Sequence, residues 1–338
     1  MTVEFYRVEP SPRTSWRLAV LMGANSRTYK FALGSALLAC AAQDRTEVTL
    51  DELAVLYAMG LVVHLAEAPQ APSGSPLGDS DFLTVARQEA EASTKSGRPT
   101  ERLLHAAVRS MPGMVMQKFH NLGGGSTEVA HRFYKLAGSP RKRIVRLTPD
   151  LCQVARSEQA AGLRTELGAR WNIVESSFAA GVGRSLVAEG VAVDWATLKL
   201  TDKHRRRSVT GVADALIGFQ HGRCLSCSAP ITPEERTAVD HVFPHSLMRR
   251  FGNVSGWHGP DLDVIWNLAP AHETCNTAKS DRLPTPDELH RLAQRNEAIL
   301  QSPHPLKKTL QLTLGSAGYS GGPGQWPYFL RQVQAVCD

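Results

Sequence analysis

Two short pairs of metal-ligand residues constrain this chain more than any other feature of its sequence. Two residues lie between Cys224 and Cys227 in RCLSCS, and two residues likewise lie between His272 and Cys275 in AHETCN. This spacing lets a tight turn direct two side chains at one ion, and three sulfurs with one imidazole suit tetrahedral zinc. The alternative is a chance occurrence of both pairs, but two matched pairs that bracket one compact region favour a structural zinc site.

The segment between the two pairs is predicted to form two strands. The stretches AVDHVFPHSL (238–247) and VIWNLAPAH (264–272) are the predicted strands, and a long loop joins them. A helix is expected to begin near His272 and to carry Asn276 and Lys279. Trp266 alternates with Asn267, so its side chain is expected to face the core. The predicted order is therefore first pair, strand, loop, strand, second pair and helix.

This order resembles the HNH endonuclease family, whose ββα-metal core carries CxxC, DHxxPxS, NL and a second pair that continues into CNxxK. The resemblance covers about residues 222–284, and the matching residues are Asp240, His241, Pro244, Ser246, Asn267, Leu268, Cys275, Asn276 and Lys279. Two positions depart from the pattern. His272 replaces a cysteine and can still bind zinc, and Asn276 stands at the third signature position, where asparagine also occurs in active members of the family.

The resemblance implies a metal-dependent endonuclease that nicks or cuts DNA, and the chemistry of the residues agrees. Histidine side chains titrate near neutral pH, which suits His241 as the general base that deprotonates water. Asp240 and Asn276 offer hard oxygen ligands for a catalytic Mg²⁺ or Mn²⁺. By resemblance, Asn267 orients the segment that holds His241. His245 is a rival base close by in the sequence.

Each of these residues also has an ordinary structural interpretation. Alone, His241 would more often be a surface histidine, Asp240 a turn acid and Asn276 an amide on a helix surface. The complete set in motif order favours catalysis. The alternative function is a zinc-stapled DNA-binding module without catalysis, and a nuclease directed at RNA is a third possibility that the sequence leaves open.

The distribution of basic residues indicates a polyanionic partner. The formal net charge of the chain is +6, which by itself is a weak signal. Within the motif region, four residues are expected to meet phosphates of double-stranded DNA: Lys279, Arg282, Arg249 and Arg250. The runs KHRRR (203–207) and RKR (141–143) are wider candidates for contact with DNA. The alternative for each run is a solvated surface, which is the more common role of a run of charges.

The remainder of the chain is predicted to be mainly helical. Apolar spacing predicts helices at 29–43, 82–95, 101–111 and 286–300, and Thr49 with Glu52 has capping-box spacing at the start of an apolar helix. The sequence therefore predicts an α+β chain in two domains. Residues 1–209 would form a helical recognition or regulatory domain, and residues 210–338 an HNH nuclease domain with a C-terminal helical extension.

The N-terminal sequence lacks the apolar core of a signal peptide, and no apolar run reaches the length of a membrane span. Together with the metal-type spacing of its cysteines, this predicts a cytoplasmic protein. The stretch ANSRTYKFALGSALLACAAQ (24–43) resembles the opening of bacterial HNH proteins of restriction and phage defence, such as the HNH protein of type II Zorya systems. That resemblance implies an antiviral role with other proteins of a defence system as partners.

Overall fold

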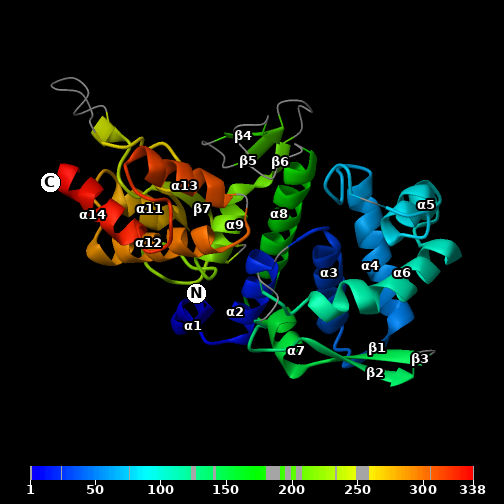
Figure 1. Cartoon of the computed structure of the whole chain (residues 1–338). Helices are drawn as coiled ribbons and strands as arrows, with labels where there is room; N and C mark the ends of the chain where they lie inside the picture. Colours follow the sequence, from blue (N-terminus) through cyan, green and yellow to red (C-terminus); the bar gives the residue numbers. More distant parts are fainter. Residues whose placement is uncertain are drawn as a thin grey trace. The chain divides into compact units, whose positions relative to one another are not determined.

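The computed structural model describes residues 2–23, 25–75, 77–122, 127–139, 142–179, 191–194, 199–202, 208–232, 234–248, 259–304 and 306–337. These residues form an α+β structure that is mostly helical and has small sheets (Figure 1). The chain divides into two compact units. One comprises Met1–Val8, Ala161–Ala169 and Gly183–Asp338, and the other comprises Glu9–Ala160 and Arg170–Val182. We call them the C-terminal unit and the N-terminal unit. The predicted boundary at Thr210 therefore falls inside the C-terminal unit.

The N-terminal unit is a group of helices with one small sheet. Its elements are α2 (Pro12–Arg17), a π-helix (Leu18–Met22), α3 (Tyr29–Ala42), β1 (Glu47–Thr49), α4 (Leu50–Leu65), α5 (Phe82–Ser96), α6 (Glu101–Met114), a 3₁₀ turn (Met116–Lys118), β2 (Tyr134–Ser139), β3 (Lys142–Leu147) and α7 (Pro149–Arg156). The helix α8 (Ala160–Ala179) contributes residues to both units.

Local sequence signals explain where several of these helices begin and end. The predicted capping box is confirmed at α4, where the Thr49 hydroxyl accepts from the Glu52 N–H at 3.2 Å and the Glu52 carboxylate accepts from the Thr49 N–H at 2.7 Å. Asp81 caps the start of α5, and Gly97 ends that helix with a φ of 67°. Glycine reaches this left-handed conformation at little cost.

The sheet of the N-terminal unit has the order β1-β3-β2, and both strand pairs are antiparallel. One face is buried because Val48, Val145 and Leu147 alternate inward, and α4 contacts β1 and β3. The core beside it is aromatic: Trp16 lies edge-on to Phe133 at a centroid distance of 5.2 Å. A conventional apolar core thus holds this unit together.

The C-terminal unit holds the predicted motif region. Its elements are α1 (Thr2–Val8), β4 (Val191–Asp194), β5 (Lys199–Asp202), β6 (Ser208–Gly211), α9 (Val212–Phe219), β7 (Thr237–His241), β8 (Leu268–His272), α11 (Glu273–Lys279), α12 (Pro286–Gln301), α13 (Leu306–Ser316) and α14 (Trp326–Cys337). The strands β4, β5 and β6 form a second three-stranded sheet.

The predicted ββα order is present as β7, β8 and α11. The two strands pair antiparallel, with Asp240 opposite Ala269 and His241 opposite Leu268. Trp266 is fully buried, as predicted, and packs edge-on to Phe329 of α14 at a centroid distance of 5.1 Å. The predicted alternation with Asn267 is not the reason, because Asn267 is also fully buried and both residues lie in a turn. The second strand is shorter than the predicted stretch, because residues 264–267 form a bend and a turn that lead into β8.

Candidate metal centre and adjoining polar site

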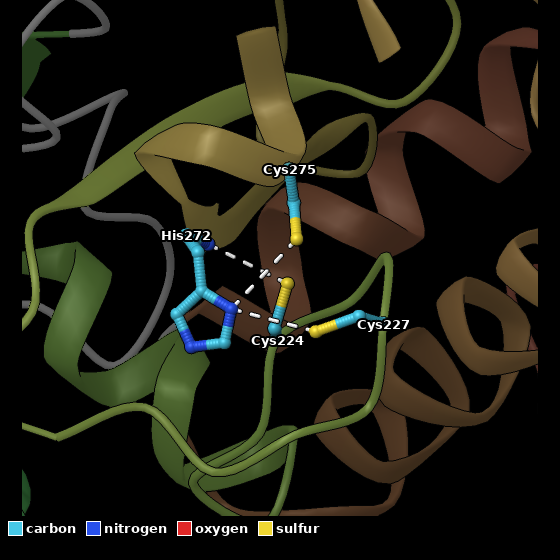
Figure 2. A group of neighbouring side chains, drawn as sticks. All are labelled: Cys224, Cys227, His272 and Cys275. Carbon is cyan, nitrogen blue, oxygen red and sulfur yellow. Dashed lines mark hydrogen bonds between the residues drawn. The ribbon is translucent and has the colours of Figure 1, made fainter. Parts of the chain in front are cut away.

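Four side chains converge where the first pair meets the start of α11. Cys224, Cys227, His272 and Cys275 each offer a ligand atom, and these atoms all lie within 4.8 Å of one another. His272 Nδ1 is 3.4 Å from Cys227 Sγ and 3.8 Å from Cys275 Sγ (Figure 2). Among the residues that the structure describes, no other group of three or more histidines, cysteines or acids meets this criterion. Three sulfurs and one imidazole nitrogen fit a closed tetrahedral zinc site.

The surroundings of His272 fix which of its ring nitrogens faces the sulfurs. Nε2 lies 3.1 Å from the carbonyl oxygen of Pro230, which can only accept a hydrogen bond, so the proton resides on Nε2. The lone pair of Nδ1 then faces the three cysteines. A histidine that binds zinc commonly uses its second nitrogen in this way to fix the orientation of the ring.

The first pair is shaped by a tight turn. The N–H of Cys224 donates to the carbonyl of Ala229 at 2.9 Å, and Ser228 adopts a φ of 62° so that its N–H can return to the Cys224 carbonyl. The helix α12 then holds the turn, because the Arg291 guanidinium donates to the carbonyls of Leu225 and Ser226 at 2.6 and 2.7 Å. The turn that carries Cys224 and Cys227 is therefore held by Arg291, a residue 66 positions after Leu225 in the sequence.

The thiols of the cluster differ in their acidity. Burial opposes a fall in the pKa of Cys227, but the backbone hydrogen bond from Ala229 and the neighbouring polar groups lower it. Burial and the nearby Cys227 and Cys224 sulfurs raise the pKa of the Cys275 thiol to about 12. Three thiolates at this separation repel one another, so a divalent cation is the natural counter-charge and its binding would release protons.

Asn267 braces the segment that follows His241. Its side-chain oxygen accepts from the N–H of Phe243 at 2.8 Å, and its side-chain nitrogen donates to the carbonyls of Phe243 and Leu262, each at 2.8 Å. The side chain is fully buried, so these bonds meet no competition from water. Asn267 thus fixes the backbone two residues after His241.

His241 is half-buried and has an acidic partner that the sequence did not indicate. Its Nε2 lies 3.0 Å from Asp263 Oδ1, and the two side chains are 31% and 43% exposed. Asp263 lies in the turn before β8, whose shape depends on the bond from the Asp263 N–H to Asp261 Oδ1 at 2.9 Å. No motif position corresponds to Asp263, so only the folded loop reveals it. The ring of His245, the rival base, is centred 5.5 Å from the ring of His241.

Asp240 and Lys279 form a buried ion pair beneath His241. The Lys279 ammonium lies 3.0 Å from Asp240 Oδ1 and 2.8 Å from the carbonyl oxygen of His241. The two side chains are 7% and 1% exposed. Burial raises the pKa of Asp240, and the Lys279 charge acts against that shift. The predicted contact of Lys279 with phosphate is therefore corrected, because its ammonium joins α11 to the end of β7.

This ion pair limits the predicted catalytic cation site. Asn276 lies half-buried on α11, three residues before Lys279, as the helix prediction required. One oxygen of Asp240 already binds the Lys279 ammonium, which also supplies the positive charge that a cation would bring. One oxygen of Asp240 is left for a cation, and the role of Asp240 and Asn276 as ligands stays a prediction.

The other predicted phosphate contacts have different outcomes. Arg282 is 42% exposed and makes two hydrogen bonds of 2.7 Å to the Glu288 carboxylate, which α12 presents. The Arg282 charge is therefore largely paired with Glu288 within the C-terminal unit. Arg249 and Arg250 lie outside the described residues, as do the run 203–207 and Arg141.

Arg295 supports the site from α12 and was not predicted. It is 1% exposed, and its guanidinium donates to the carbonyls of Trp266 at 2.8 Å and Ile265 at 3.1 Å, and to that of Leu268. Burial lowers its pKa to about 9. An arginine in an amphipathic helix gives no sequence signal of this kind, because it looks like an ordinary surface cation. Here it fixes the backbone on both sides of Asn267.

Three comparisons of the chain, with protein-family models, with curated proteins and with solved structures, find no match. No helix in the described part of the chain has the length and apolar character needed to cross a membrane.

Proposed function

We propose that this protein is a metal-dependent HNH-type endonuclease that hydrolyses phosphodiester bonds of DNA. The observation that carries the proposal is the brace around His241: Asn267 holds the backbone of Phe243 through two hydrogen bonds and that of Leu262 through a third, and Asp263 Oδ1 lies 3.0 Å from the His241 ring nitrogen. The buried amide that fixes the adjoining backbone and the carboxylate beside the ring together support a catalytic role for His241. Restriction or phage defence, with other proteins of such a system, is the role that the resemblance of residues 24–43 suggests.

In this proposal His241 removes a proton from the water that attacks phosphorus. The attack forms a bond from the water oxygen to phosphorus, and the bond to the leaving 3′-oxygen breaks. The Asp263 carboxylate stabilises the charged ring that results from proton transfer and keeps its orientation. The Asp240–Lys279 pair fixes the backbone carbonyl of His241, so the base is held from both sides.

A divalent cation would supply Lewis acidity and would stabilise the leaving oxygen. The residues proposed to hold it are Asp240, through the oxygen that Lys279 does not bind, and Asn276. The four-residue zinc cluster is a separate and structural site, because all of its ligand positions come from the protein.

The test is cleavage of supercoiled plasmid by the full chain with added Mg²⁺ or Mn²⁺. We expect nicked or linear product from the wild-type protein and at least a hundredfold less from His241→Ala, because general-base catalysis contributes about 10²–10⁴-fold. Zinc content and thermal stability should be unchanged in that variant. His290→Ala is the matched control, since His290 is an exposed histidine of the same unit.

The same assay separates the alternatives. Wild-type protein that binds duplex DNA but leaves it intact with every divalent ion would replace the proposal with the zinc-stapled binding module. Faster cleavage of RNA than of DNA would assign the site to an RNA nuclease. Equal cleavage by wild type and His241→Ala would remove His241 from the mechanism and direct attention to His245.

A further inference from the structure

The solvent face of the sheet in the N-terminal unit carries an unbalanced row of cations. In the pairing of β2 with β3, Lys135 lies opposite Arg146 and Ser139 lies opposite Lys142. Because side chains alternate along a strand, Lys135, Lys142 and Arg146 share one face, while Val145 and Leu147 point into the core. We call the pair of strands β2 and β3 the basic ribbon. Figure 1 shows it at the edge of the N-terminal unit.

The charges on this face do not cancel. Glu47 of β1 lies beside Arg146 and pairs with it at 2.7 Å, with both side chains largely exposed. Lys135 and Lys142 are exposed, and neither makes an ion pair within the described ranges. Lys135 stands directly across the ladder from Arg146, so the three cations and the one carboxylate of Glu47 leave a net charge of about +2 on this face. The face therefore favours a negatively charged partner.

The dimensions of the row suit a nucleic acid. The Lys135 and Arg146 position lies four residue steps along the ribbon from the Lys142 position, which corresponds to about 13 Å at 3.2–3.4 Å per residue. The major groove of DNA is about 12 Å wide and admits a two-stranded ribbon. Cations at the two ends can therefore reach phosphates on the two borders of one groove.

The face lacks the features of a protein interface. Protein partners are usually anchored by a buried aromatic or a large aliphatic side chain. The residues between the cations on this face are Ala137, Ile144 and Thr49, which are small or already half-buried. Backbone phosphates need only the cations, because such contacts position a protein without reading bases.

We propose that the basic ribbon is a docking surface for the backbone of double-stranded DNA. This inference rests on the proposed nuclease function for its choice of partner. It requires no particular placement of the two units. In this proposal the ribbon contributes affinity for DNA, and the site around His241 cleaves the phosphodiester bond.

The test is binding of a fluorescent DNA duplex by the full chain, measured by anisotropy across a range of NaCl concentrations without added divalent cations. Each phosphate contact contributes about one unit to the slope of log affinity against log salt. Lys135→Gln with Lys142→Gln should lower this slope by about two and weaken binding at 0.1 M salt by at least about tenfold. Both substitutions lie on the surface, and circular dichroism checks that the fold persists.

Arg87→Gln with Lys95→Gln is the matched control. It removes two exposed cations from α5 in the same unit, but Glu91 stands one helical turn from each of them. We expect this control to bind DNA as the wild type does. Equal losses in both double variants would overturn the inference, because they would reflect net charge alone. Tighter, ribbon-dependent binding of duplex RNA would also overturn it by assigning the face to RNA.

Failure of this inference is distinguishable from failure of the proposed function. An unchanged salt slope in the ribbon variant, with plasmid cleavage intact, rejects the ribbon and leaves the nuclease. A lowered slope in a wild-type protein that cuts no nucleic acid supports the ribbon and rejects the nuclease.

Discussion

At the scale of single residues, the candidate site depends on polar groups that are held in place by other polar groups. Asn267 satisfies three backbone groups around the base, Lys279 bridges Asp240 and the His241 carbonyl, and Asp263 binds the ring itself. Orientation of this kind lowers the reorganisation that a reaction requires. Asp263 is the only one of these partners outside the motif, and it therefore provides the sharpest test of the arrangement.

Asp263→Asn should lower the rate of plasmid cleavage at least about tenfold without changing DNA affinity. The amide keeps the shape of the carboxylate but cannot stabilise a protonated ring. The deciding readout is the double variant with His241→Ala, which should be no slower than His241→Ala alone, because two residues that act as one unit are not additive. Asp287→Asn, an exposed carboxyl of the same unit, is the control. Independent, additive losses would show that Asp263 has only a structural role.

A second residue-scale prediction concerns His120 in the N-terminal unit. Its Nε2 accepts from the Phe133 N–H at 3.0 Å, and burial lowers its pKa from 6.5 to about 4. The unfolded chain therefore binds a proton first as pH falls, so the stabilisation is complete above about pH 6.5 and is lost progressively toward pH 4. Between pH 7 and pH 5 this one group should cost about 2 kcal/mol of unfolding free energy.

Urea unfolding at the two pH values measures this effect, with the fluorescence of the buried Trp16 and Trp171 as the probe. In His120→Gln, the amide oxygen can accept the same N–H bond but does not titrate. The difference in stability between pH 7 and pH 5 should shrink by about 2 kcal/mol in this variant. An unchanged difference would exclude His120 as the source.

At the scale of elements, patterns that repeat within one helix or strand were predictable from sequence. The capping box at Thr49, the apolar spacing of α3 and α12, and the two short strands around the motif all appear where local signals placed them. The α+β class follows from these elements. Local signals work here because a cap is satisfied by groups a few residues away, and because the spacing of an apolar face can be seen within one helix.

Elements whose stability comes from distant contacts were not predictable. Within residues 191–211, the described residues form three strands of four residues each, too short for a clear alternation, where a helical domain was expected. In the site, the cysteine spacing indicated the four-residue cluster. Arg295 and Asp263 became visible only once carbonyls or a ring from other elements lay beside them.

At the scale of the whole molecule, both units have an aromatic core, and the cluster that fits zinc lies in the C-terminal unit. The N-terminal unit has an aromatic core that includes Trp16, Phe119 and Phe133. In the C-terminal unit, Trp266 packs against Trp326 and Phe329. The cluster itself lies on a separate, small apolar group that consists of Cys224, Ile231 and Ala271 with Ile217 and Cys275 packed against it. Two of these five residues are themselves predicted zinc ligands, so removal of the metal would weaken the packing around the cluster.

Zinc removal should therefore destabilise one unit and spare the other. We expect one zinc per chain. In differential scanning calorimetry, a chelator such as 1,10-phenanthroline should lower the transition temperature of the C-terminal unit. The reason is that structural zinc binding contributes on the order of 10 kcal/mol to folding. Cys227→Ser should reproduce this effect without chelator; Cys227 is exposed, so its loss removes a ligand and little packing. Cys152→Ser, a free cysteine of the N-terminal unit, is the control. A uniform shift of the whole profile, or full zinc content in Cys227→Ser, would contradict the assignment of the cluster as the staple of one unit.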